Sequence, residues 1–262
     1  ELTRITQSVK MKIGVFDSGV GGLSVLKSLL EARLFESVIY YGDTARVPYG
    51  TKDRQTIIRF SLQALEFFSS HNVDMLIVAC NTASAYALDS LKASANFPVV
   101  GVITPGVIAT QNKLKSKDSQ ILVIGTKATI RSNLYEKKLK QKGFNNIKSL
   151  ATGLFVPFVE EGIFSGEPLL ALFKHYFAHI QSPEALILGC THFPLIAQSL
   201  QEFFGNQTLL IHSGEAIVEY IQNTYNLQSN KILKSLSFHA SDDVGALKAS
   251  AKMWLGKDYL SN

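Results

Sequence analysis

The chain of 262 residues contains two cysteines, Cys80 and Cys190, and they lie in similar surroundings. Each follows a short hydrophobic run and precedes small polar residues: residues 76–82 are LIVACNT, and residues 186–192, located 110 positions later, are LILGCTH. A lone buried cysteine most often serves as a small hydrophobic side chain. That role gives no reason for a cysteine to recur beside polar residues at an equivalent position, so we interpret both as functional.

Two thiols that approach one small ligand from opposite sides suit a particular reaction, which removes a proton from one face of a carbon and returns one to the other face. One cysteine acts as thiolate base and the other as thiol acid, and the roles exchange in the reverse direction. A thiol in the first turn of a helix is expected to have a pKa below about 8.5, because the helix dipole stabilises the thiolate. The pair therefore favours racemisation or epimerisation over a disulfide, which is disfavoured in a reducing compartment.

The cysteine segments belong to a longer internal repeat. The strand run at residues 13–18 (IGVFDS) corresponds to residues 121–127 (ILVIGTK), where Asp17-Ser18 align with Thr126-Lys127 at an offset of 109. Residues 47–49 (VPY) correspond to residues 156–158 (VPF) at the same offset. Matches in the same order at nearly the same offset predict similar domains related by duplication.

The elements that position these residues are predicted from hydrophobic runs bounded by Gly, Asp, Asn or Pro. Such runs predict strands at residues 12–16, 38–41, 74–79, 98–103, 120–125, 147–151, 184–189 and 208–212, with a further short strand at 236–239 in a mainly helical C-terminal region. Helical spacing between the runs, as after Asp53, predicts an α/β fold with parallel sheets. Ligands of such sheets bind beyond the carboxyl ends of the strands, where both cysteines and Thr126 are expected to lie.

Composition and charge exclude other classes of protein. Hydrophobic residues make up 46% of the chain and charged residues 18%, as in ordinary globular proteins. The longest hydrophobic runs are too short to span a membrane, and the residues before Met11 do not form a secretory signal, so we expect a cytoplasmic protein. Residues 1–10 are expected to be an extension outside the fold. The net charge of +5 arises from residues 111–150, which carry ten basic and two acidic residues, so nucleic acid is not expected as the primary partner.

Other motifs carry less chemistry. The turn Gly19–Gly22 lacks the last glycine of a dinucleotide fingerprint, because Ser24 stands there. His175 and His179 have the spacing of a metal pair on a helix, but no acidic residue lies between them, and we interpret them as structural; no metal site is expected.

Four longer motifs together resemble the glutamate racemases, enzymes of bacterial cell-wall synthesis. They are residues 14–22 (GVFDSGVGG), 41–50 (YGDTARVPYG), 78–84 (VACNTAS) and 188–194 (LGCTHFP), which occur in the order typical of that family. The resemblance covers nearly the whole chain from Met11.

The resemblance implies an interconversion of L-glutamate and D-glutamate that needs no cofactor and supplies D-glutamate for peptidoglycan. It implies that Cys190 takes the α-proton from L-glutamate and Cys80 from D-glutamate. The matching auxiliary catalytic positions are Asp17, Glu160 and His192. The matching substrate contacts are Asp17, Ser18, Tyr49, Gly50, Asn81, Thr82, Thr191 and His192, to which we add Thr126. A discontinuous first domain of residues 11–103 and 214–262, a second domain of residues 104–213, a binding cleft between them and a homodimer are also implied.

Alternatives to this function stay open at this point. An aspartate racemase of the same superfamily typically has a Gly-Gly-Met-Gly-Pro type turn where this chain has Asp17–Gly22, a difference that favours glutamate. A two-lobed protein that only binds an amino acid needs neither thiol. From the residues alone, Glu160 could be a solvated loop carboxylate and Asp17 could cap the following helix.

Overall fold

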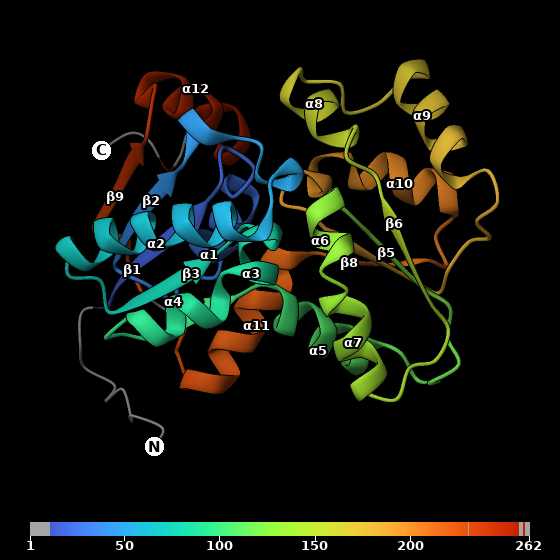
Figure 1. The fold of residues 1–262 in the computed structure, drawn as a ribbon, viewed down its shortest axis with the longest axis horizontal. Coiled ribbons are helices and arrows are strands. Elements are labelled where there is room, and N and C mark those ends of the chain that lie inside the picture. The colour runs from blue at the N-terminus through green and yellow to red at the C-terminus, as the bar shows by residue number, and fades with distance from the viewer. Residues whose placement is uncertain (1–10, 230, 257–258, 260–262) are drawn as a thin grey trace.

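Two parallel β-sheets, each covered by helices, lie side by side in the computed structural model (Figure 1). The structure describes residues 11–229, 231–256 and 259; the extension expected at residues 1–10 lies outside them. No helix among the described residues is both long and apolar enough to cross a membrane.

The first sheet has five parallel strands in the order β4-β3-β1-β2-β9. Their bounds are β1 (Lys12–Asp17), β2 (Ser37–Gly42), β3 (Met75–Val78), β4 (Val99–Gly101) and β9 (Ser235–Ala240). The second sheet has four parallel strands in the order β6-β5-β7-β8. Their bounds are β5 (Ile121–Gly125), β6 (Ile147–Ala151), β7 (Ala185–Gly189) and β8 (Leu209–Ile211). These bounds confirm the α/β class and the predicted strands, with differences of one or two residues at their ends.

The strand orders confirm the internal repeat. Strand β1 begins 109 residues before β5, whereas β2, β3 and β4 each begin 110 residues before β6, β7 and β8. The order β4-β3-β1-β2 of the first sheet is therefore the order β8-β7-β5-β6 of the second. Strand β9 extends only the first sheet, where it pairs with β2.

The helices follow the strands in the alternation that the sequence predicted. They are α1 (Leu23–Glu31), α2 (Arg54–Ser70), α3 (Asn81–Tyr86), α4 (Leu88–Ser94), α5 (Ile103–Lys113), α6 (Lys127–Arg131), α7 (Leu134–Gln141), α8 (Phe155–Glu160), α9 (Glu167–Phe177), α10 (Ala197–Phe204), α11 (Ser213–Tyr225) and α12 (Val244–Leu255). Short 3₁₀ helices among the described residues include η1 (Thr44–Arg46), η2 (Tyr49–Thr51) and η3 (Phe193–Ile196). Helix α2 begins after Asp53, whose carboxylate accepts hydrogen bonds from the N–H groups of Gln55 and Thr56 and so caps the helix.

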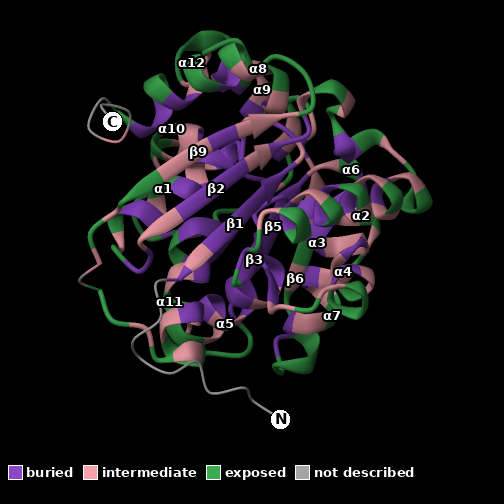
Figure 2. Ribbon diagram, turned by 90° about the vertical axis from the view of Figure 1, so that its left-hand side faces the viewer, coloured by how far each residue is buried: buried purple, intermediate pink, exposed green. Residues whose placement is uncertain are grey.

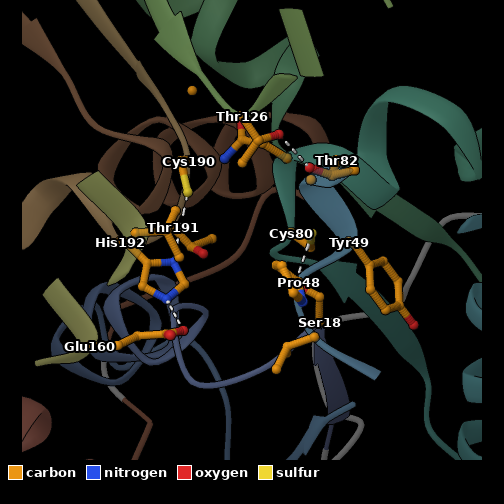
Figure 3. Close-up of a pocket in the computed structure, with 15 residues that line it drawn as sticks. Ser18, Pro48, Tyr49, Cys80, Thr82, Thr126, Glu160, Cys190, Thr191 and His192 are labelled. Carbon is orange, nitrogen blue, oxygen red and sulfur yellow. Dashed lines mark hydrogen bonds and ion pairs between the residues drawn. The ribbon is translucent and has the colours of Figure 1, made fainter. Parts of the chain in front are cut away.

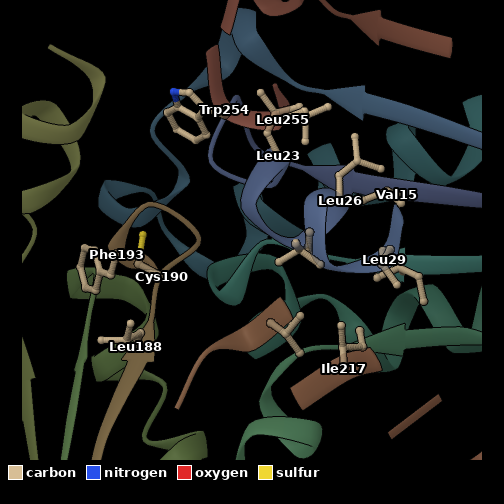
Figure 4. Close-up of a cluster of buried hydrophobic side chains, with 14 of the residues drawn as sticks. Val15, Leu23, Leu26, Leu29, Leu188, Cys190, Phe193, Ile217, Trp254 and Leu255 are labelled. Carbon is tan, nitrogen blue, oxygen red and sulfur yellow. The ribbon is translucent and has the colours of Figure 1, made fainter. Parts of the chain in front are cut away.

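The hydrophobic core fixes the strand ends against each other. Strand β3 is fully buried, as Figure 2 shows for the central strands of the first sheet. One cluster of buried side chains includes Val15 and Leu23 around β1 together with Leu188 and Phe193 around β7 (Figure 4). Because burial of each such side chain stabilises the fold by about 1.5–3 kcal/mol, this shared cluster holds the sheets in a defined relation.

Candidate active site

The carboxyl ends of four strands meet at a cavity of about 400 Å³, a volume that includes its opening to solvent (Figure 3). These strands are β1, β3, β5 and β7, and pairing aligns their ends, because Phe16 lies opposite Val78 in the first sheet and Gly125 lies opposite Gly189 in the second. The cavity is lined by residues from both sheets: Ser18, Val47, Pro48, Tyr49, Gly50, Cys80, Asn81, Thr82, Thr126, Val156, Glu160, Gly189, Cys190, Thr191 and His192.

Cys80 ends strand β3 and stands at the N-cap of α3. Its Sγ accepts a hydrogen bond from the N–H of Ala83 at 3.5 Å and donates one to Ser18 Oγ at 3.5 Å. The side chain is 5% exposed and faces the cavity. Its position at the N-terminus of a helix agrees with the prediction, although it is the N-cap residue and precedes the first turn.

The acid–base state of Cys80 differs from the expectation based on the helix dipole. Burial, and after it the charge of Asp17, raises the pKa of this thiol to about 12, although hydrogen bonds with Ser18 and Ala83 oppose the rise. The helix N-terminus does stabilise a thiolate, but desolvation of the buried sulfur outweighs it. Cys80 is therefore a thiol at neutral pH and is suited to donate a proton.

Cys190 follows strand β7 and has a different set of neighbours. Its Sγ lies 3.7 Å from His192 Nδ1, and His192 Nε2 lies 3.0 Å from Glu160 Oε1. His192 is 6% exposed, whereas the Glu160 side chain at the end of α8 is 41% exposed. These contacts form a chain from thiol to imidazole to carboxylate.

The charge of His192 follows from that chain. Burial alone lowers the pKa of the imidazole, but hydrogen bonds with Cys190 and Glu160 and the negative charges around it raise the pKa from 6.5 to about 10. His192 is therefore protonated at neutral pH. The protonated imidazole thus places a positive charge 3.7 Å from the Cys190 sulfur.

Asp17, which ends strand β1, lies behind the cavity wall rather than in its lining. It is fully buried, its Oδ2 accepts a hydrogen bond from the N–H of Gly19 at 2.9 Å, and its Oδ1 accepts one from Thr191 Oγ1 at 3.4 Å. Burial raises the pKa of this carboxyl, although the charge of His192 opposes the rise. Asp17 thus links the turn after β1 to the segment that carries Cys190.

Threonine hydroxyls connect the sheets on the Cys80 side. Thr82 Oγ1 lies 2.9 Å from Thr126 Oγ1 and 3.0 Å from Thr129 Oγ1. Thr126 caps α6, since its Oγ1 accepts a hydrogen bond from the N–H of Thr129. Gly50 also lies against Thr126, because a Cβ built on Gly50 would come within 2.5 Å of Thr126 Cβ.

Tyr49 contributes to the cavity through its main chain more than its ring. Its phenol points away from the thiols (Figure 3) and donates a hydrogen bond to Asp43, which also accepts one from Arg46 Nε at 2.8 Å. The N–H groups of Tyr49 and Gly50 begin the 3₁₀ helix η2, a position in which N–H groups have no partner within the helix. They are available to an anionic ligand.

The structure brings together the residues that the sequence singled out, with the exception that Asp17 lies behind the lining. Sequence reasoning missed Val47, Pro48, Val156 and Gly189, which complete the lining. The repeated Val-Pro-aromatic triplets contain the first three of these and were the signal for them. Within the described part of the chain, no group of three or more His, Cys, Asp or Glu side chains could hold a metal ion, and His175 and His179 are both exposed.

Comparison with known proteins relates this arrangement to a family. The chain is 61% identical over 245 residues to a glutamate racemase from Campylobacter jejuni, and the aligned region covers 94% of this chain and 98% of that protein. It is 55% identical over 253 residues to one from Helicobacter pylori, with 94% and 99% covered. The crystal structure of glutamate racemase from Campylobacter jejuni superimposes with a TM-score of 0.92 over 94% of this chain and 98% of that chain.

A more distant structure has the same fold. Glutamate racemase from Francisella tularensis, crystallised in complex with D-glutamate, is 36% identical, has a TM-score of 0.82 and covers 95% of this chain and 94% of its own. Residues 13–221 of this chain match the sequence profile of the Asp/Glu/Hydantoin racemase family. The chain therefore belongs to the Asp/Glu/Hydantoin racemase family, a family of isomerases.

Proposed function

We propose that this protein interconverts L-glutamate and D-glutamate by a two-base reaction in which Cys80 and Cys190 act on opposite faces of the α-carbon. The observation that carries the proposal is the placement of two thiols on different sides of one cavity (Figure 3), Cys80 beside Ser18 and Cys190 beside His192. The names of the relatives in the comparison support glutamate as the substrate.

In the direction from L-glutamate, Cys190 takes the α-proton as a thiolate. The C–H bond breaks, an S–H bond forms on Cys190, and the S–H bond of Cys80 breaks as its proton goes to the opposite face of the carbon. The protonated His192 stabilises the starting thiolate, and the high pKa of Cys80 keeps the donor protonated. The products are D-glutamate, a Cys190 thiol and a Cys80 thiolate, which is the state that acts on the D isomer.

The reverse direction depends on a thiolate at Cys80, which the charge of Asp17 disfavours. The α-ammonium group of a bound amino acid brings a positive charge into the same space and offsets that effect. We infer that substrate binding prepares Cys80 as a base. His192 and Glu160 act as auxiliary residues on the Cys190 side, and Asp17 acts on the Cys80 side.

The substrate carboxylates need hydrogen-bond donors, which the lining supplies. These are the hydroxyls of Ser18, Thr82 and Thr126, the amide of Asn81, and the N–H groups of Tyr49 and Gly50, whereas the Thr191 hydroxyl donates to Asp17. Fixed donors at strand ends and first turns suit carboxylate groups. No step of this reaction requires a cofactor.

The setting of the reaction is also part of the proposal. We assign residues 11–103 and 214–262 to a first domain and residues 104–213 to a second, since β9 pairs with the first sheet. We further propose a cytoplasmic homodimer that supplies D-glutamate for peptidoglycan.

Exchange of the α-hydrogen with solvent tests the proposal. Purified protein in D₂O with a reducing agent and no added cofactor should replace the α-hydrogen of either glutamate isomer with deuterium and produce the other isomer, as followed by proton NMR and circular dichroism. Absence of exchange would leave a protein that only binds amino acids.

Aspartate serves as the matched control substrate. It carries the same reacting carbon with a side chain shorter by one methylene, a difference worth about 10–200-fold in a fitted pocket. Turnover of aspartate equal to or faster than that of glutamate would contradict the assignment of the substrate.

A further inference from the structure

We propose that Tyr135 on α7 is a positioning residue that, through Asn81 and Ser213, fixes the separation of the two cysteine-bearing segments. The inference rests on the two-thiol reaction proposed above. Of these three residues, only Asn81 lines the cavity. Asn81, Tyr135 and Ser213 belong to α3, α7 and α11, helices from both halves of the chain.

We call the hydrogen-bonded series of Tyr135, Asn81 and Ser213 the brace. Its first part holds the Cys80 segment. The phenol of Tyr135 donates a hydrogen bond of 2.7 Å to Asn81 Oδ1, and both residues are buried. Asn81 follows Cys80 directly and is the first residue of α3. A contact to this side chain therefore fixes the turn that carries Cys80 relative to α7, which packs on the second sheet.

The second part of the brace holds the Cys190 segment. Asn81 Nδ2 donates a hydrogen bond of 3.4 Å to Ser213 Oγ, and Ser213 Oγ donates one of 3.4 Å to the carbonyl oxygen of Leu188. Leu188 precedes Cys190 by two residues on strand β7. One buried series of hydrogen bonds thus joins the ends of β3 and β7.

The ring of Tyr135 adds a steric contact to the same segment. A Cβ built on Gly189 would lie 3.3 Å from Tyr135 Cε2, and one built on Gly106 of α5 would lie 3.5 Å from the other edge of the ring. The ring is therefore seated between these glycines beside Cys190. In agreement, burial raises the pKa of the phenol, and the charge of Cys190 adds to the rise.

The reaction makes this separation important. Each turnover requires one thiol to remove a proton while the other lies within reach of the opposite face, and a misplacement of about 1 Å can cost on the order of 100-fold in rate. Removal of the phenol hydroxyl leaves Asn81 Oδ1 buried without its donor, so the α3 turn shifts or recruits water. Binding of glutamate involves many other donors and is less affected.

The Tyr135→Phe variant tests the brace, because it keeps the ring between the glycines and removes only the hydroxyl. We expect kcat to fall about 10-fold, with a smaller change in KM. The values of kcat/KM must fall equally in both directions, because the equilibrium constant between enantiomers is 1. The informative readout is the ratio of deuterium entering unreacted substrate to deuterium entering the inverted product, which should rise because the second thiol no longer meets the intermediate promptly.

A structural defect alone would lower the amount of active enzyme and leave that ratio unchanged. Tyr225→Phe, which removes a half-buried phenol at the end of α11, is the matched control and should keep both kcat and the ratio. Ser213→Ala removes the other end of the brace and should raise the same ratio, so it supplies the readout if Tyr135→Phe does not fold. An active wild-type protein together with an unchanged ratio in the variants overturns the brace, whereas wild-type protein without exchange overturns the two-thiol reaction itself.

Discussion

The Cys80 side and the Cys190 side of the cavity share a backbone plan but differ in chemistry. Cys80 follows β3, which lies next to β1. Cys190, located 110 residues later, follows β7, which lies next to β5. Cys80 is surrounded by a helix N-terminus, the Ser18 hydroxyl and the buried Asp17, whereas Cys190 is next to a protonated imidazole that Glu160 supports. The duplicated scaffold places the sulfur atoms, and the side chains that differ between the repeats give each sulfur different hydrogen-bond partners and different neighbouring charges.

The comparison extends to the contacts that cross between the sheets. On one side Thr191 donates a hydrogen bond to Asp17 at the end of β1, and on the other Thr82 meets Thr126 at the end of β5. Strands β1 and β5 are equivalent in the repeat, so each cysteine segment is held by the first strand of the opposite sheet. The Asp17 carboxylate holds the Cys190 segment, whereas threonine hydroxyls hold the Cys80 segment.

Replacement of either thiol should have the largest effect and should break the symmetry of the sides. Cys80→Ala and Cys190→Ala should each lower racemisation by at least about 1,000-fold, because each removes a general acid or base. By the proposed reaction, Cys80→Ala should retain slow α-hydrogen exchange only with L-glutamate, and Cys190→Ala only with D-glutamate. Proton NMR in D₂O with each pure isomer measures this.

A thermal shift produced by glutamate provides the control for these variants, since the donors that hold the carboxylates stay in place. Retention of most racemase activity by either variant, or the same isomer preference in both, would contradict a two-base reaction with one thiol on each face.

Substitution of Gly21 should have an effect of intermediate size on the rate, because this residue follows β1 of the first sheet and lies against residues next to Cys190. A Cβ at this position, in the turn after β1, would come within 2.3 Å of Thr191 Oγ1 and 2.5 Å of His192 Nδ1. Gly21→Ala should therefore displace the partner of Cys190 and lower kcat about 10- to 100-fold, measured by the racemase assay. Gly153→Ala is the matched control, because a Cβ there meets no atom within 4 Å, and it should keep wild-type kcat. Equal kcat in both variants would show that the turn after β1 does not position His192.

Much of the fold and of the candidate site could be predicted because its signals are local. Strands such as β3 are short hydrophobic runs, and the cysteine segments repeat in the sequence itself. The acid–base state of Cys80 could not be predicted, since desolvation depends on side chains that the fold collects from several strands. The contact between Tyr135 and Asn81 spans 54 residues, and no pattern in either segment marks the other as its partner.

A pH-dependent difference in stability is the smallest effect that distinguishes the sides. The pKa of His192 rises from 6.5 to about 10 on folding, so the folded state holds this proton more tightly than the unfolded state. The stabilisation is fully present below pH 6.5 and is lost as pH rises through about 10.

The Tm of wild-type protein should exceed that of His192→Asn by about 5 °C at pH 6. That difference should shrink steadily toward pH 10, as measured by circular dichroism melting. Ser18→Ala, on the Cys80 side, should show a Tm difference from wild type that stays constant over the same range, because Ser18 does not titrate, the folded Cys80 thiol keeps its proton there, and the unfolded thiol titrates equally in both proteins. A constant difference for His192→Asn as well would mean that His192 is neutral when folded, and the two sides would then differ in geometry and not in charge.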